Sequence, residues 1–120
     1  MKNYIKNLEL FDYTKFNNYV HKDFILKCYD ENKKQTHILF QIYYAHCTYR
    51  IDISGLEVKE TEKGGKIYSY YKGEPLQFTM YETTYKYSKK QMEKTVEFLK
   101  INFDNIIETY MKLNKNIYVE

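Results

Sequence analysis

The chain has 120 residues and a formal net charge of +3, and its 19 basic residues are spread evenly along it. This length is enough for one domain with an apolar core, and the weak, even charge excludes a dedicated duplex-DNA binder. The first residues, MKNYIKNLELF, are interrupted by Lys6 and Glu9, so we expect neither a signal peptide nor a membrane contact.

Composition also points to the origin of the gene. Lys, Tyr, Ile, Asn, Phe and Met, whose codons are rich in A and T, account for 64 residues, whereas Gly, Ala, Arg and Pro account for seven. We therefore expect an AT-rich genome, such as that of a low-GC bacterium, its phages or plasmids, or an AT-rich parasite. Cys28 and Cys47 lack metal-ligand spacing, so we expect free thiols in a cytoplasmic protein, in the host cytoplasm if a phage encodes it.

The N-terminal segment, residues 1–21, has a short helical pattern. Tyr4, Leu8 and Phe11 recur at helical spacing, which predicts a short helix near residues 3–11. Residues 12–21 show no regular period, and we expect either a further helical turn or a loop there.

Residues 22–87 change to a period of two, which predicts β-strands. Turn signals separate them at the polar run 30–35, at Ala45–His46, at Gly64–Gly65 and at Gly73–Pro75. The Gly-Gly pair is the clearest hairpin signal, joining a strand near 56–61 to one at 66–72. The last strand is expected at 76–86.

Two irregularities interrupt the alternation. The step from Tyr44 to Cys47 changes the phase, and a tight turn or bulge at Ala45–His46 explains it. Cys47 is then expected on the apolar face of the next strand, as a buried, inert thiol. Gly55 changes the phase again before Leu56 and Val58, which predicts that one strand ends there and another begins.

The C-terminal stretch 88–114 predicts one long helix. Seven apolar residues recur at spacings of four and three and form a stripe along one side: Met92, Val96, Leu99, Phe103, Ile106, Tyr110 and Leu113. Ser88 and Gln91 have the spacing of a reciprocal capping box. Phe98, Ile101, Ile107 and Met111 widen the stripe, which favours packing on a sheet over pairing of two helices in a homodimer.

These elements predict one α+β domain over residues 1–120. We expect an antiparallel meander of five or six strands with one long C-terminal helix packed on one face. The face that receives the helix is expected to gather eleven side chains: Phe24, Leu26, Cys28, Ile38, Phe40, Ile42, Ile51, Ile53, Leu76, Phe78 and Met80.

The other face is expected to be rich in tyrosine and to bind a partner. Tyrosine and arginine are enriched at interfaces, and Arg50 is the only arginine of the chain. The opposing interpretation is that tyrosine tolerates half-exposure and is inflated by AT-rich coding. The predicted partner-binding residues are Tyr29, Tyr43, Arg50, Lys66, Tyr68, Tyr70, Tyr81, Tyr85 and Lys86.

No pattern predicts catalysis, a metal or a cofactor. Cys47 and His46 are expected on opposite faces, and no paired ligand spacing for zinc occurs. The stretch 63–66, Lys-Gly-Gly-Lys, lacks the spacing and context of a phosphate-binding loop. We expect a protein that is not an enzyme.

The leading hypothesis is a small binding protein that acts by contact with a protein partner. This hypothesis draws on an analogy of size and composition with accessory proteins of phages and mobile elements, such as anti-CRISPR inhibitors of host defence nucleases. The alternatives are binding of single-stranded nucleic acid by the Tyr/Lys face and a helix-grip pocket for a small ligand. A homodimer through the helix or the sheet face is a further expectation.

Overall fold

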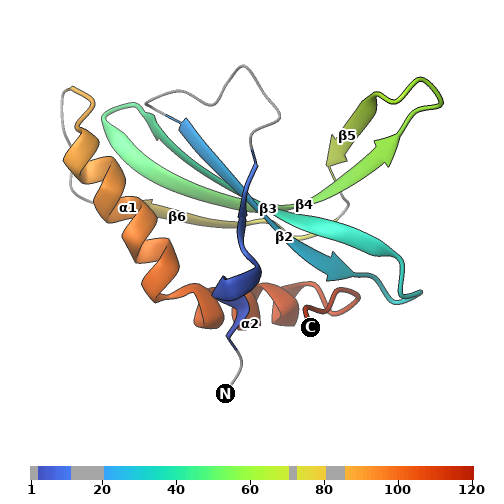
Figure 1. Cartoon of the computed structure of the whole chain (residues 1–120). Coiled ribbons are helices and arrows are strands. Elements are labelled where there is room, and N and C mark those ends of the chain that lie inside the picture. Colours follow the sequence, from blue (N-terminus) through green and yellow to red (C-terminus); the bar gives the residue numbers. More distant parts are fainter. Residues whose placement is uncertain (1–2, 12–20, 71–72, 81–85) are drawn as a thin grey trace.

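The computed structural model describes residues 3–11, 21–70, 73–80 and 86–120, with the backbone alone for Tyr70. An antiparallel six-stranded sheet is followed by two C-terminal helices, and a short 3-10 turn precedes it, so the predicted α+β class is confirmed (Figure 1). The elements are η1 (Tyr4–Asn7), β1 (Glu9–Leu10), β2 (His21–Tyr29), β3 (Gln35–Ala45), β4 (Thr48–Glu60), β5 (Lys66–Tyr70), β6 (Leu76–Met80), α1 (Lys89–Ile101) and α2 (Phe103–Leu113).

Strand β4 organises the sheet. The strands follow the order β1-β2-β3-β4-β5, while β6 returns to pair with β4 instead of β5. On the edge of β4 away from β3, residues 49–53 pair with β6 and residues 56–60 pair with β5. The β4–β5 hairpin therefore projects from the body of the molecule (Figure 1).

Gly55 does not end a strand, contrary to the sequence prediction. Residues 48–60 form one strand, in which Ile53 and Gly55 lie on the face that the helices cover and Ser54 and Leu56 lie on the reverse face. The change of phase arises because burial moves from one face to the other. Before Gly55 the apolar residues pack under the helices, and after it Leu56 and Val58 join a second cluster on the reverse face.

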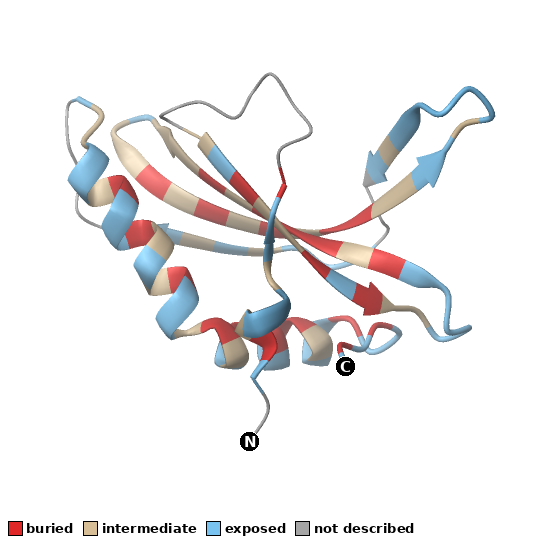
Figure 2. Ribbon diagram, viewed as in Figure 1, coloured by how far each residue is buried: buried red, intermediate tan, exposed pale blue. Residues whose placement is uncertain are grey.

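The main core lies between the sheet and the two helices. All eleven side chains predicted for the helix-bearing face belong to it, seven of them buried and Phe24, Leu76, Phe78 and Met80 partly buried (Figure 2). Phe40 of β3 meets Phe103 of α2 with ring centroids 5.2 Å apart. Tyr4 of η1 fastens the N-terminus to α2, because its amide donates to Asp104 Oδ1 at 2.9 Å and its hydroxyl to Glu108 Oε1 at 3.0 Å.

The predicted long helix is divided into α1 and α2 at Asn102. This residue leaves helical geometry at φ −98° and ψ 11°, and its Nδ2 donates to the Phe98 carbonyl at 2.9 Å. A short amide side chain that competes for a helix carbonyl favours such a break. Two apolar residues were wrongly assigned to the core: Leu113 is 47% exposed, and Ile101, which lies about 200° around the helix from Leu99, is 74% exposed.

The start of α1 is held by β4. Ser88 Oγ accepts from the Gln91 amide at 3.3 Å, as predicted for half of the capping box. The Ser88 amide does not serve the other half, since it donates to Tyr49 Oη at 2.7 Å. The buried phenol of Tyr49 therefore positions the first turn of the helix over the sheet.

The β3–β4 turn corrects the prediction for Cys47. His46 and Cys47 form the two central residues of the hairpin, with φ of 52° and 62°, as in a type I′ turn. The break in alternation predicted this turn one residue too early, at Ala45–His46, because the glycine or asparagine that normally marks such a turn is absent. Cys47 consequently lies at a half-buried turn position and not on the apolar face of a strand.

Two residues of α1 test which side of the helix is buried. Leu99→Ala should lower the free energy of unfolding by about 2–5 kcal/mol, because it leaves a cavity in the core. Ile101→Ala, the matched control, should change it by no more than about 0.5 kcal/mol. Urea denaturation of both variants measures the difference, and equal losses would contradict the exposure of Ile101 in the folded protein.

The two thiols should differ sharply in reactivity. Cys28 is fully buried, and burial raises the pKa of its thiol to about 12, whereas Cys47 is partly accessible. We expect iodoacetamide at pH 8 to label Cys47 alone in the native protein and both thiols in urea, as read by intact mass. Labelling of native Cys47→Ser would show that Cys28 is reachable.

Candidate functional site

The reverse face of the sheet carries a polar patch where β2, β3, β4 and β6 lie side by side. Both helices pack on the opposite side (Figure 1). Cross-strand pairing places its residues in two rows. We call this patch the polar face; it consists of the row His21, Tyr43, Arg50 and Thr79 and the row Asp23, Gln41, Asp52 and Gln77.

Asp52 is the centre of the hydrogen bonds on the polar face. Its Oδ2 accepts from Tyr43 Oη and its Oδ1 from Gln77 Nε2, each at 2.6 Å. Burial and the hydrogen bond to Asp52 raise the pKa of Tyr43, and nearby Arg50 opposes that shift. Side chains from three strands are thereby held in fixed positions before any ligand arrives.

Arg50 lies between Tyr43 and Thr79 in the first row. Its Nε is shielded from solvent and has no hydrogen-bond acceptor. No carboxylate of the described residues forms an ion pair with it, although Asp52 stands two residues along the same face of β4. The guanidinium, which is charged at any physiological pH, is therefore only partly satisfied within the fold.

His21 and Asp23 form a second charged group at the β2 end. His21 Nε2 lies 2.7 Å from Asp23 Oδ1, but not in hydrogen-bond geometry, and Asp23 is only 3% exposed. Burial raises the pKa of Asp23, and the nearby His21 lowers it by less. Sequence analysis missed this pair as part of the site, although the alternation of residues 23–29 places Asp23 on the face of Tyr43.

A hollow opens on the reverse face where β4 and β6 run together. It has a volume of about 320 Å³ and is lined by Gln41, Asp52, Ile53, Ser54, Pro75, Leu76 and Gln77. The Oγ of Ser54 is buried without a hydrogen-bond partner. The polar face is therefore indented beside the Asp52 carboxylate.

The predicted tyrosines do not form one surface. Tyr43 is on the polar face, but Tyr68 packs edge-on against Phe11 at 5.4 Å in the second apolar cluster. Tyr29 stacks on Tyr118 of the C-terminal segment at 5.6 Å. The side chain of Tyr70, and Tyr81 and Tyr85 altogether, lie outside the described residues.

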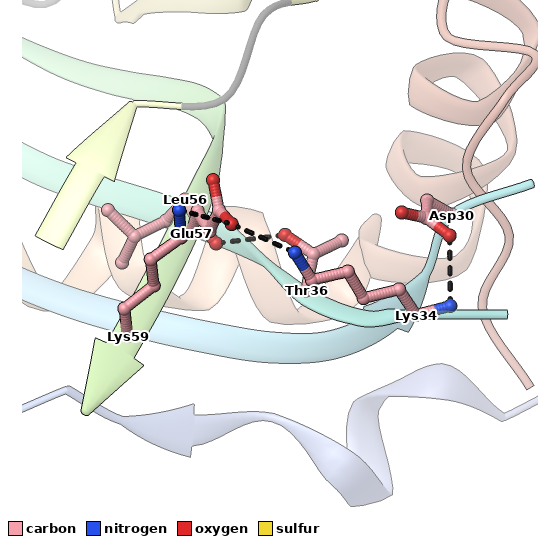
Figure 3. A network of polar contacts seen from close by, with 6 residues as sticks. All are labelled: Asp30, Lys34, Thr36, Leu56, Glu57 and Lys59. Carbon is pink, nitrogen blue, oxygen red and sulfur yellow. Dashed lines mark hydrogen bonds and ion pairs between the residues drawn. The ribbon is translucent and has the colours of Figure 1, made fainter. Parts of the chain in front are cut away.

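The predicted lysines are exposed but scattered. Lys66 begins β5 and Lys86 lies just before α1, far from each other in the fold. Lys34, in the β2–β3 loop, lies 3.3 Å from Glu57 Oε1, and Lys59 lies 3.6 Å from the same oxygen (Figure 3). These contacts lower the pKa of Glu57, so Lys34 serves a surface ion-pair network at the end of the sheet.

The described residues provide neither the side-chain cluster of a metal site nor a nucleophilic Cys28 thiol. Within residues 3–11, 21–70, 73–80 and 86–120, no three His, Cys, Asp or Glu side chains cluster as a metal site would require. The raised pKa of Cys28 keeps that thiol protonated. None of the helices in the described part of the chain has the length and apolar character needed to cross a membrane.

Comparison with known proteins leaves the chain unassigned: no family model, curated protein or solved structure matches it.

The buried carboxyl of Asp23 gives a pH-dependent test of the site. A carboxyl whose pKa is raised by folding favours the native state below its ordinary pKa of 3.8 and loses that contribution as pH rises through the folded value. Asp23→Asn should therefore melt at a higher temperature than the unmodified protein at pH 7, with the gain shrinking towards about pH 4.

Thermal melts at several pH values measure this effect, with Glu62→Gln in the exposed β4–β5 turn as the control. A lower melting temperature for Asp23→Asn at pH 7 would mean that charge pairing with His21 outweighs the burial of Asp23.

Proposed function

We propose that this chain is a small, non-enzymatic binding protein whose polar face contacts a protein partner. The observation that carries the proposal is the fixed arrangement of Tyr43, Asp52 and Gln77 beside an arginine that has no ion pair among the described residues. Tyrosine and arginine dominate the binding energy of many protein interfaces.

Preorganisation supports the proposal. The hydrogen bonds of 2.6 Å to Asp52 restrict the Tyr43 ring and the Gln77 amide, so binding loses less side-chain entropy than a free surface would. The hollow of about 320 Å³ beside them offers room for a side chain of the partner. The two apolar clusters gather the buried apolar residues of the sheet, and the polar face is a separate surface beside them.

The alternatives receive less support. Stacking of unpaired bases requires open rings, but Tyr29, Tyr43 and Tyr68 each contact a side chain of the same chain. A helix-grip pocket requires space beneath the helices, where Phe40, Phe103 and Leu99 are fully packed. Inhibition of a host defence nuclease by a phage or mobile-element protein remains one specific form of the proposed protein contact.

Site-directed photocrosslinking tests the proposed face. We expect a photoreactive residue at exposed Thr79 to give a discrete crosslinked product in the lysate of a low-GC bacterium. A photoreactive residue at Glu97, exposed on α1, is the matched control and should not give that product.

Competition then links the product to the polar face. Excess unlabelled protein should abolish the crosslink, whereas Gln77→Arg, which adds a bulky charge at an exposed position, should compete at least about tenfold less well. The proposal is rejected if Gln77→Arg competes equally, or if only the Glu97 probe gives a product.

A further inference from the structure

We infer that Arg50 is the receptor for a carboxylate of the protein partner, held by the two outer nitrogens of its guanidinium. The inference rests on the proposed function, because it names the chemical group that the partner presents to the polar face. Arg50 is a cation of the polar face with no counter-ion among the described residues, and a carboxylate of the partner supplies one.

The Nε atom of Arg50 is buried without a hydrogen-bond acceptor among the described residues. Because it is shielded from solvent and makes no hydrogen bond there, this part of a permanent positive charge is removed from water without an acceptor. A chain that uses one arginine and 18 lysines keeps the guanidinium at this position. A bound anion would offset that burial, and the planar fork of arginine matches a carboxylate in two hydrogen bonds.

The natural internal acceptor is already occupied. Asp52 lies on the same face two residues away, but its two oxygens accept from Tyr43 Oη and Gln77 Nε2. These two neutral donors hold the carboxylate in place, and Arg50 has no ion pair among the described residues. Its neighbour Tyr43 is a neutral hydroxyl, so the positive charge of the guanidinium still has no counter-ion there.

The surroundings favour a carboxylate over a phosphate. The neighbouring negative charge of Asp52 repels a doubly charged anion more strongly than a singly charged one. Thr79, directly across from Arg50 on β6, is exposed and can donate its hydroxyl to a second ligand oxygen. A glutamate or aspartate side chain of the partner satisfies both donors.

The single arginine makes the test direct. An NMR spectrum of the arginine side chains contains one Nε–Hε signal, which belongs to Arg50 without further assignment. We expect saturable shifts of this signal when N-acetyl-glutamate methylamide is added, and none with sodium chloride at equal ionic strength. Thr79→Val should weaken the apparent affinity by about two- to tenfold, as expected for one lost hydrogen bond.

Three results would overturn the carboxylate assignment: no saturable shift with the glutamate probe, an equal response to chloride, or tighter binding of inorganic phosphate. The crosslinking competition separates this failure from failure of the proposed function. If Arg50→Gln competes as well as the unmodified protein while Gln77→Arg does not, the polar face binds a partner but Arg50 is not the receptor.

Discussion

Strand β4 buries apolar residues on opposite faces in its two halves, and the rest of the structure follows from this constraint. Its first half lies under α1 and pairs with β6, while its second half turns its apolar residues to the reverse face and pairs with β5. Because β4 is one continuous strand, the two cores are offset along it. The reverse side of its first half is therefore left to polar residues.

That offset explains why a polar patch can exist in the middle of a small sheet. Ionisable groups on a half-buried strand need partners, and most of them find one here: Tyr43 and Gln77 serve Asp52, and His21 faces Asp23. Arg50 stands out because its neighbours satisfy one another. An apolar residue in its place would avoid the cost of a partly buried charge, and this cost is the reason for proposing that Arg50 contacts another molecule.

The candidate site was only partly predictable. Arg50 and Tyr43 were recognised by residue type and by alternation, because both properties are local to one strand. Tyr29 and Tyr68 have the same local pattern, yet Tyr118 and Phe11 cover them. These covering residues come from the two ends of the chain, and no period within a strand can reveal such a contact. The pairing of Asp52 with Gln77 likewise depends on β6 returning to β4.

The sequence by itself determined the class of fold, eleven of the sheet side chains in the main core and the positions of most turns, because periodicity and turn chemistry act over a few residues. Tertiary structure alone decided three features: the change of face at Gly55, the division of the helix at Asn102 and the return of β6 to β4. Each depends on which distant surface is present to bury a side chain. Leu99 is buried and Ile101 is exposed because residues two positions apart lie on nearly opposite sides of a helix, and only the side of Leu99 faces the sheet.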